Sequence, residues 1–213
     1  MEVKICGLRS PLEAEYLNAA GADYAGFVFF PPSKRNVSLE QAKEIMKCLK
    51  PDIRKVAVLV SPDVSMIEAL QAAPFDILQI HKVLTKEVLE AARCPVWYAV
   101  NVSDPEALQE KVSFLEELPY ALQQKVTGIV VDGAGYGSGK TFEWKKTGRR
   151  WRESTIFHNR KFILAGGLNA ANVQEGIELF APDVVDVSSG VEGVSGKDRD
   201  KINAFIGKVR EHE

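Results

Sequence analysis

The chain has 213 residues, which suits a single domain and is long enough to bury a core. Its net charge of -2 and pI near 6.0 give no reason to expect a nucleic acid or an anionic membrane as a partner. No apolar stretch approaches the roughly 18 residues of a membrane span, and three widely spaced cysteines without a C-x-x-C pair indicate neither a disulfide framework nor a zinc site.

The first predicted strand, from Glu2 to Cys6, has one apolar and one polar face. Its alternation places Val3 and Ile5 on one side and Lys4 and Cys6 on the other. A buried strand does not need a lysine and a thiol on the same face. This face therefore requires an explanation beyond packing.

Capping signals mark the start of most helices. Ser10-Pro11-Leu12-Glu13 combines a cap, a first-turn proline and the Glu of a capping box, which predicts a helix that runs to about Ala20 and ends at Gly21. Ser38 with Gln41 predicts a second such start. Further helices are expected to begin at Ser61-Pro62, at Thr85 and at Asp104-Pro105.

Apolar segments alternate with these helices. Strands are expected at Asp23–Phe29, Ile53–Val60, Asp76–Ile80 ending at His81, Cys94–Val100 and Gly128–Asp132. The second of the chain's strands is followed by a loop that carries two adjacent cations, Lys34 and Arg35. Asp132 is a carboxylate at the end of its strand, followed by a glycine-rich loop from Gly133 to Lys140.

Two later apolar runs each end in small residues. The first is Phe162–Asn169, with Gly166 and Gly167, and the second is Val184–Gly190, with Ser188, Ser189 and Gly190. Backbone N–H groups at two neighbouring turns can converge on one anion, so the pair of turns predicts a phosphate site.

The helix between these runs is expected to begin at a capping Asn169. Its apolar positions Val173, Ile177 and Phe180 share one face. A final packed helix carries Ile202, Phe205, Ile206 and Val209. The basic segment 145–152 is interpreted as a solvated helix face or loop.

About eight strand-then-helix units with short connections predict a parallel sheet covered by helices. A closed barrel would bring the first strand beside the last and collect Cys6, Asp132 and the phosphate turns at one rim. No G-x-G-x-x-G follows the first strand, which argues against a dinucleotide-binding sheet. These observations favour an α/β fold class, a single-domain (β/α)8 TIM barrel over residues 1–213, with closure of the sheet as the remaining question.

Several motifs together resemble the phosphoribosylanthranilate isomerase family of tryptophan biosynthesis. They are Lys4–Gly7, Pro32–Arg35, Leu78–His81, Gly139–Trp144, Ala165–Leu168 and Asp186–Glu192. The resemblance spans nearly the whole chain. It implies a (β/α)8 barrel that converts N-(5'-phosphoribosyl)anthranilate into its 1-deoxyribulose 5-phosphate isomer by an Amadori rearrangement, without a metal or an organic cofactor.

The resemblance also implies roles for particular residues. Cys6 matches the family's general base, Asp132 its general acid, and Arg35 the residue that holds the anthranilate carboxylate. The turns at Gly166-Gly167 and Ser188-Ser189-Gly190 match its phosphate site. Lys82 and Tyr136 each stand where Gly is common in the family, so the resemblance specifies the chemistry but not the detail of these two loops.

The remaining candidates follow from the predicted faces. Asp186 points inward with Ser188, so we expect it to pair with Lys4 across the closing strands. His81 is expected to be structural or to lie beside the substrate. A thiol acts as a base only as thiolate, and Lys4, on the same face as Cys6, is the cation expected to lower the thiol pKa.

Two other functions stay open at this point. The related aminoimidazole sugar-phosphate isomerase of histidine biosynthesis would require a carboxylate at the position of Cys6 and a second phosphate site. A non-catalytic phosphate-binding barrel would lack turnover altogether. The expected partner is a small phosphorylated molecule, the expected location is cytoplasmic, and the sequence is compatible with a homo-oligomer.

Overall fold

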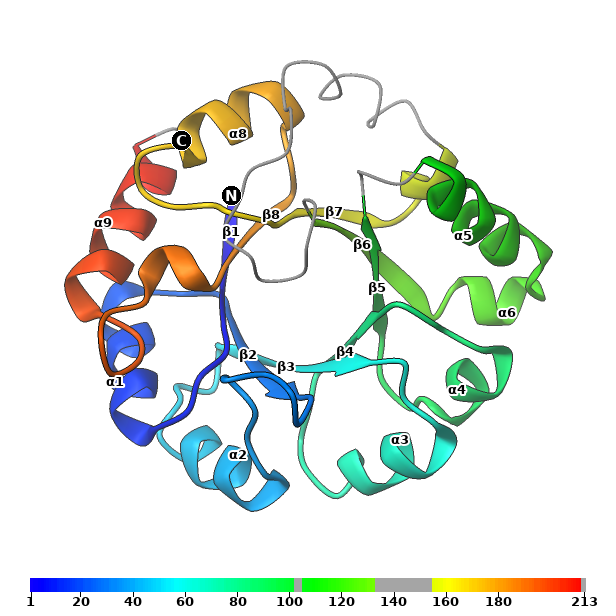
Figure 1. Ribbon diagram of the computed structural model, residues 1–213, viewed down its shortest axis with the longest axis horizontal. Coiled ribbons are helices and arrows are strands. Elements are labelled where there is room, and N and C mark those ends of the chain that lie inside the picture. The colour runs from blue at the N-terminus through cyan, green and yellow to red at the C-terminus, as the bar shows by residue number, and fades with distance from the viewer. Residues whose placement is uncertain (102–104, 133–154, 212–213) are drawn as a thin grey trace.

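Eight parallel strands, each paired with the next along the chain, form a ring that closes where β8 pairs with β1 (Figure 1). This is a computed structural model, which describes residues 1–101, 105–132 and 155–211. The strands are β1 (Glu2–Cys6), β2 (Tyr24–Phe29), β3 (Arg54–Val60), β4 (Ile77–His81), β5 (Val96–Asn101), β6 (Val126–Asp132), β7 (Lys161–Leu164) and β8 (Val184–Val187). The predicted (β/α)8 barrel is confirmed.

Helices surround the ring of strands on its outside (Figure 1). They are α1 (Pro11–Ala20), α2 (Leu39–Met46), α3 (Val64–Leu70), α4 (Lys86–Ala91), α5 (Pro105–Glu117), α6 (Tyr120–Gln123), α8 (Val173–Phe180) and α9 (Arg199–Arg210). Two short 3-10 turns are η1 (Thr155–Phe157) and η2 (Ser189–Val191). Among the described helices, none is long and apolar enough to cross a membrane.

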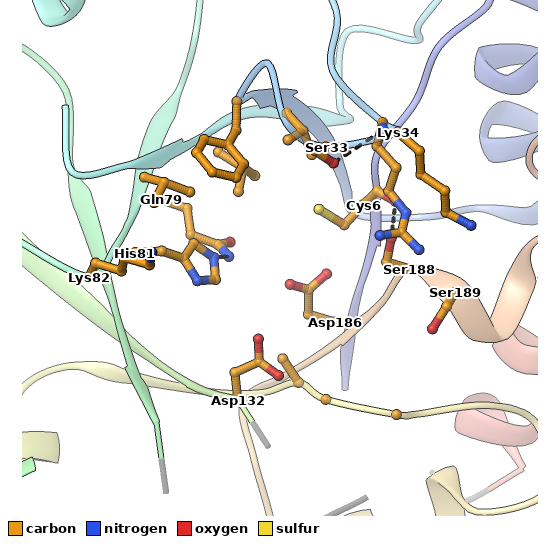
Figure 2. Close-up of a pocket in the computed structure, with 18 of the residues that line it drawn as sticks. Cys6, Ser33, Lys34, Gln79, His81, Lys82, Asp132, Asp186, Ser188 and Ser189 are labelled. Carbon is orange, nitrogen blue, oxygen red and sulfur yellow. Dashed lines mark hydrogen bonds between the residues drawn. The ribbon is translucent and has the colours of Figure 1, made fainter. Parts of the chain in front are cut away.

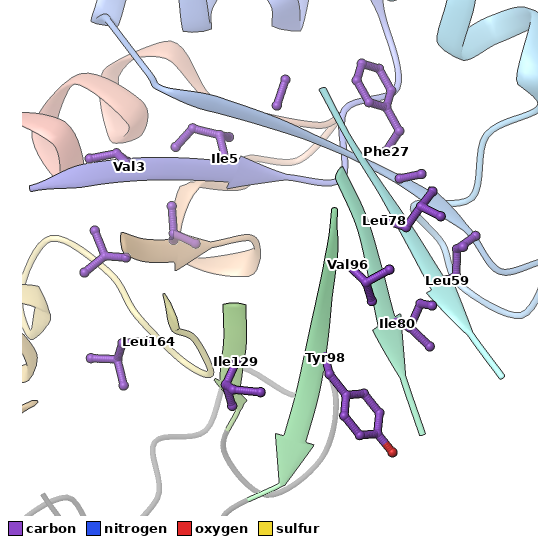
Figure 3. Close-up of a cluster of buried hydrophobic side chains, with 14 of the residues drawn as sticks. Val3, Ile5, Phe27, Leu59, Leu78, Ile80, Val96, Tyr98, Ile129 and Leu164 are labelled. Atoms are coloured by element: carbon purple, nitrogen blue, oxygen red, sulfur yellow. The ribbon is translucent and has the colours of Figure 1, made fainter. Parts of the chain in front are cut away.

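The alternation along each strand separates two layers of buried side chains. Outward residues such as Val3 and Ile5 pack against the helices, and Figure 3 shows them with Phe27, Leu59 and Leu78 on the outer faces of their strands. Inward residues form a second cluster inside the barrel, where the Tyr24 and Trp97 rings meet edge to face with centroids 4.9 Å apart. Lys4 and Cys6 point inward, as the period of two predicts.

An ionic cluster lies at the end of the barrel where the strands begin. Glu2 forms ion pairs with Arg54 and Lys161 and accepts a 3.0 Å hydrogen bond from the Tyr24 hydroxyl. The Arg54 guanidinium also lies 3.9 Å above the Tyr24 ring. The charged groups at this end of the barrel are therefore paired with one another.

Local capping signals locate several helix starts correctly. Both predicted capping boxes form, Ser10 with Glu13 at α1 and Ser38 with Gln41 at α2. Thr85 caps α4, and Gly21 ends α1 in the left-handed conformation with φ 72°.

Two predicted helix starts are wrong by a few residues. The helix after β3 begins at Val64, because Asp63 rather than Ser61 accepts the N–H of Met66, at 2.8 Å. Ser61 adopts φ 45° instead, and its hydroxyl accepts a hydrogen bond from the backbone of Val83.

The second error lies after β7. Helix α8 begins at Val173 with Asn172 as its N-cap, while the Asn169 side chain accepts from the N–H of Ala171 and closes a local turn. The predicted apolar face of this helix, Val173, Ile177 and Phe180, is buried.

Most strand limits differ by one or two residues from those predicted. Strand β4 ends at His81, as predicted, and begins at Ile77, one residue later than predicted. The predicted glycine-rich loop from Gly133 to Lys140, the Thr141–Trp144 segment and the basic segment 145–152 lie outside the described residues, as does Tyr136.

Candidate active site

A cavity of about 620 Å³ opens at the carboxyl ends of the strands. All of the predicted site residues except Gly190 line it, which brings together residues from β1, β4, β6 and β8 and from the loops that follow β2, β7 and β8. Active sites of (β/α)8 enzymes lie at this rim, because the strand-to-helix loops meet there. The site residues predicted from the sequence therefore lie together in the fold.

Cys6 lies at the end of β1 with its sulfur directed into the cavity (Figure 2). Gly26, its register partner on β2, provides the space, because a Cβ at Gly26 would lie 2.9 Å from the sulfur. Burial raises the pKa of the Cys6 thiol, and the cations of Lys4 and Lys197 oppose this without overcoming it. Lys4 therefore acts on the thiol pKa in the expected direction, but the net pKa of Cys6 is raised, because desolvation is the larger effect.

Lys4 and Asp186 form an ion pair inside the barrel, beneath the cavity. Lys4 Nζ donates to Asp186 Oδ2 at 2.7 Å, and the two residues are register partners on the closing strands. The predicted pairing is confirmed. Burial lowers the pKa of Lys4, but Asp186 and Cys6 raise it by more, so the lysine stays charged next to the thiol.

Asp132 ends β6 and is buried, with its carboxyl group directed into the cavity from a different side than the Cys6 sulfur (Figure 2). Its register partner at the end of β5 is Asn101. The pocket therefore places a thiol and a carboxyl group around one common space.

The two predicted phosphate turns are adjacent in space. Gly166 and Gly167 adopt left-handed conformations with φ 87° and 70°. The Asn172 side-chain amide donates a hydrogen bond to the Gly167 carbonyl oxygen at 3.0 Å. A Cβ at Gly190 would lie 2.0 Å from the Leu168 carbonyl oxygen, so only glycine permits this contact between the turns.

Ser188 joins the second phosphate turn to the strand that carries the thiol. Its hydroxyl donates to the Cys6 carbonyl oxygen at 2.9 Å. Ser189 also lines the cavity and begins η2, so it lies at the start of a helical turn. Backbone N–H groups at such turns favour an anion such as phosphate.

Gln79 and His81, neighbours on the inner face of β4, form a polar pair in the cavity wall. Gln79 Nε2 lies 2.9 Å from His81 Nε2. Burial lowers the pKa of His81 to about 3, with Lys4 and Lys111 adding to the effect, so the imidazole is neutral. Gln79 was not predicted as a site residue, because one glutamine in an apolar strand gives no signal before its inward direction is known.

Arg35 lines the cavity, but its guanidinium already has a protein partner. Nε donates to Glu192 Oε1 at 2.5 Å, and Nη2 donates to Glu192 Oε2 at 3.2 Å. Lys197 Nζ, which is buried, also contacts Glu192 Oε1 at 3.2 Å. Neither Glu192 nor Lys197 was predicted, although the Asp186–Glu192 motif that carried the resemblance ends at this glutamate.

The pocket can bind an anion and can transfer protons. A thiol and a carboxyl group face the same space, which suits a reaction with one general base and one general acid. Arg35 adds a cation with planar geometry for a second anionic group. A substrate with a phosphate and a carboxylate separated by a reacting carbon skeleton fits these features.

Comparisons with known proteins agree with this arrangement. The family model described as N-(5'-phosphoribosyl)anthranilate (PRA) isomerase matches residues 3–208. The N-(5'-phosphoribosyl)anthranilate isomerase of Streptococcus gordonii is 40% identical over 211 residues, covering 99% of this chain and 98% of that protein. Its counterpart in Paramagnetospirillum magneticum is 38% identical over 219 residues, covering 99% and 97%.

Solved structures extend the similarity to three dimensions. Phosphoribosyl anthranilate isomerase from Thermotoga maritima superposes with a TM-score of 0.84 at 32% identity, over 99% of both chains. A phosphoribosyl anthranilate isomerase in complex with reduced 1-(o-carboxyphenylamino)-1-deoxyribulose 5-phosphate superposes with a TM-score of 0.82 at 31% identity, again over 99% of both.

Proposed function

The chain belongs to the N-(5'-phosphoribosyl)anthranilate isomerase family, and we propose that Cys6 and Asp132 are the base and the acid of its reaction. It is an isomerase of tryptophan biosynthesis that performs the Amadori rearrangement of N-(5'-phosphoribosyl)anthranilate to 1-(2-carboxyphenylamino)-1-deoxyribulose 5-phosphate. The observation that supports the two roles is the convergence of a thiol from β1 and a carboxyl group from β6 on one cavity beside the phosphate turns.

The reaction begins with opening of the furanose ring. Asp132 gives its proton to the ring oxygen as the C1'–O bond breaks, and the nitrogen lone pair forms the C=N bond of a Schiff base. The Cys6 thiolate then removes the C2' proton, and the electron pair moves to give an enolamine. This intermediate tautomerises: C1' gains a proton, and the C2' hydroxyl loses one to become the ketone. One acid and one base suffice, so we propose no metal or organic cofactor.

The substrate carries two anionic groups, and each has a candidate partner in the cavity. We assign the phosphate to the turns at Gly166-Gly167 and Ser188-Ser189-Gly190, where backbone N–H groups favour an anion. We assign the anthranilate carboxylate to Arg35, whose guanidinium offers a planar two-pronged fit. Binding at both ends would fix C2' between the thiol and the carboxyl group, which converts proton transfer into a step within one complex.

Other cavity residues support these groups. Asp186 keeps Lys4 charged beside Cys6 through the 2.7 Å ion pair. The neutral His81, held by Gln79, lines the wall next to the substrate without competing for a proton.

The decisive experiment measures loss of the anthranilate substrate's fluorescence during turnover. Cys6→Ala and Asp132→Asn should each lower kcat by roughly two or more orders of magnitude, the range expected for removing a positioned base or acid. Affinity for inorganic phosphate should change little, which is the control for folding. Cys6→Asp should restore part of the activity, because a carboxylate can also take a proton. Near-normal kcat in Cys6→Ala would show that the thiol is only a packing residue.

The pH profile gives an independent check. Because the reaction needs thiolate and protonated carboxyl in the same molecule, we expect kcat to be bell-shaped, with each limb belonging to the coupled pair. A profile that kept both limbs in Cys6→Asp with unchanged midpoints would assign the limbs to other groups.

We extend the proposal to the setting of the enzyme. Residues 1–213 would act as one domain in the cytoplasm, where a charged phosphorylated substrate is retained. A T. maritima relative is described as dimeric, and we propose a homo-oligomer here too. Light scattering after size exclusion would test this by giving the mass in solution, which for one chain is 23.5 kDa.

A further inference from the structure

Glu192 accepts two hydrogen bonds from one edge of the Arg35 guanidinium. The two contacts, Nε to Oε1 at 2.5 Å and Nη2 to Oε2 at 3.2 Å, use the inner side of the guanidinium. Both side chains are largely buried, with 11% and 14% of their surface exposed. Among the residues that the structure describes, none accepts a hydrogen bond from Nη1 of Arg35. The outer edge of the guanidinium, formed by Nη1 and Nη2, is therefore available to a second carboxylate.

The buried Lys197 holds Glu192 in place. Lys197 Nζ donates to Glu192 Oε1 at 3.2 Å and to the Ser188 carbonyl oxygen at 3.0 Å, and its side chain is 1% exposed. Burial raises the pKa of Glu192, but hydrogen bonds from Arg35 and Lys34 outweigh this and lower it to about 2. The glutamate stays ionised at any working pH and does not move freely with Arg35.

The stem of Arg35 is also confined. Gly7 directly follows the proposed base and has φ 89°, and a Cβ at this position would lie 2.6 Å from Cδ of Arg35. The aliphatic part of the arginine thus packs against the backbone next to Cys6. With its stem held by Gly7 and its head by Glu192, the arginine has little freedom left.

We propose that Glu192 is a positioning residue of this isomerase: it holds the inner edge of Arg35 and presents the outer edge to the carboxylate of the aromatic substrate. This inference rests on the proposed role of Arg35. Without Glu192, the cations of Arg35, Lys34 and Lys197 would surround no anion and repel one another, and Arg35 would turn toward solvent. Preorganisation of a binding group in this way increases affinity by removing the cost of ordering it.

The test compares two ligands that differ only in the carboxylate. The first is reduced 1-(o-carboxyphenylamino)-1-deoxyribulose 5-phosphate, and the second is the same compound without the ring carboxylate. Glu192→Gln should weaken calorimetric binding of the first about tenfold and leave the second unchanged. In turnover, KM for the anthranilate substrate should rise more than kcat falls. Glu44→Gln removes the carboxylate of the exposed pair with Lys47 and is the matched control, which should change neither ligand.

A double-mutant comparison links the effect to Arg35. In an Arg35→Ala background, Glu192→Gln should add little to the loss, because the group that it positions is absent. If Arg35→Ala weakens the carboxylate ligand but Glu192→Gln does not, the role of Arg35 stands and the positioning role is overturned. If neither variant weakens binding of the carboxylate ligand while the enzyme still turns over its substrate, Arg35 does not bind the carboxylate. The proposed role of Arg35 is then wrong.

Two further outcomes are decisive. Equal weakening of both ligands in Glu192→Gln would place its effect on the phosphate turn, through Lys197 and Ser188, and would overturn the proposal. If Glu192→Gln fails to fold, Glu192→Asp keeps the charge but shortens the reach to Arg35. It should then show the same loss confined to the carboxylate ligand, and equal binding of that ligand by Glu192→Asp and the natural chain would refute the inference.

Discussion

Replacing Lys4 by Met should raise the pKa of the Cys6 thiol. Burial already raises this pKa, and the cation of Lys4 is the largest influence that opposes it. Lys4→Met removes that cation and at the same time leaves Asp186 buried without its 2.7 Å partner. Both changes disfavour a second anion in the barrel, so they act in the same direction.

The magnitude follows from Coulomb's law. Two unit charges about 4 Å apart interact by about 4 kcal/mol at an effective dielectric constant of about 20. An interaction of this size is large compared with the thermal energy, so loss of the Lys4 charge should raise the Cys6 pKa by a readily measurable amount. Reorientation of nearby dipoles and the remaining cation of Lys197 reduce the rise but do not reverse its direction.

The assay is the pH dependence of alkylation of Cys6 by iodoacetamide. Cys48 is exposed and Cys94 partly buried, so both are first changed to Ser to leave one reactive thiol. The control is Lys4→Met with Asp186→Leu, which removes both charges and should shift the midpoint less than Lys4→Met alone. An identical midpoint for the natural and the Lys4→Met thiol would refute the reasoning and assign the tuning to another group.

Three further predictions concern the surroundings of the site. Gly190→Ala should weaken inorganic phosphate binding about tenfold or more by calorimetry, because its Cβ would start 2.0 Å from the Leu168 carbonyl oxygen; unchanged affinity would remove this turn from the phosphate site. Lys82 adopts φ 62°, so Lys82→Gly should raise the free energy of unfolding by up to about 1 kcal/mol in urea titrations; a loss would mean that the lysine side chain stabilises the loop. The folded pKa of His81, about 3, lies below its unfolded value of about 6.5, so stability is lost as pH falls below 6.5. His81→Asn should therefore spare about 2 kcal/mol of the acid-induced loss between pH 7 and 5, and equal losses would contradict a neutral imidazole.

Local features of the fold were predictable from the sequence, because they depend on a few neighbouring residues. The capping boxes at Ser10 and Ser38 are examples, as is the alternation that turned Lys4 inward. Ser61 shows where this reasoning stops. It precedes a proline as a helix cap often does, yet its hydroxyl instead binds the backbone of Val83, which is 22 positions away.

The candidate site was also predictable only in part. The pairing of Lys4 with Asp186 was predictable once a closed barrel made the first and last strands neighbours. Glu192 could not be matched with Arg35, because they are 157 positions apart and meet through two loops rather than through strand register. The direction of the Cys6 pKa depended on the extent of burial, which the sequence does not specify.

The contact between β1 and β8 has a consequence for protein synthesis. Asp186 and Ser188, which hold Lys4 and the Cys6 backbone, are synthesised 182 positions after the residues that they contact. A nascent chain therefore carries its thiol without the groups that set its charge until β8 has been made. Because closing so long a loop is slow and comes late, the last strand completes the barrel and the reaction centre together. An unfinished chain would be an inactive one, and chemistry would begin only once the ring is closed.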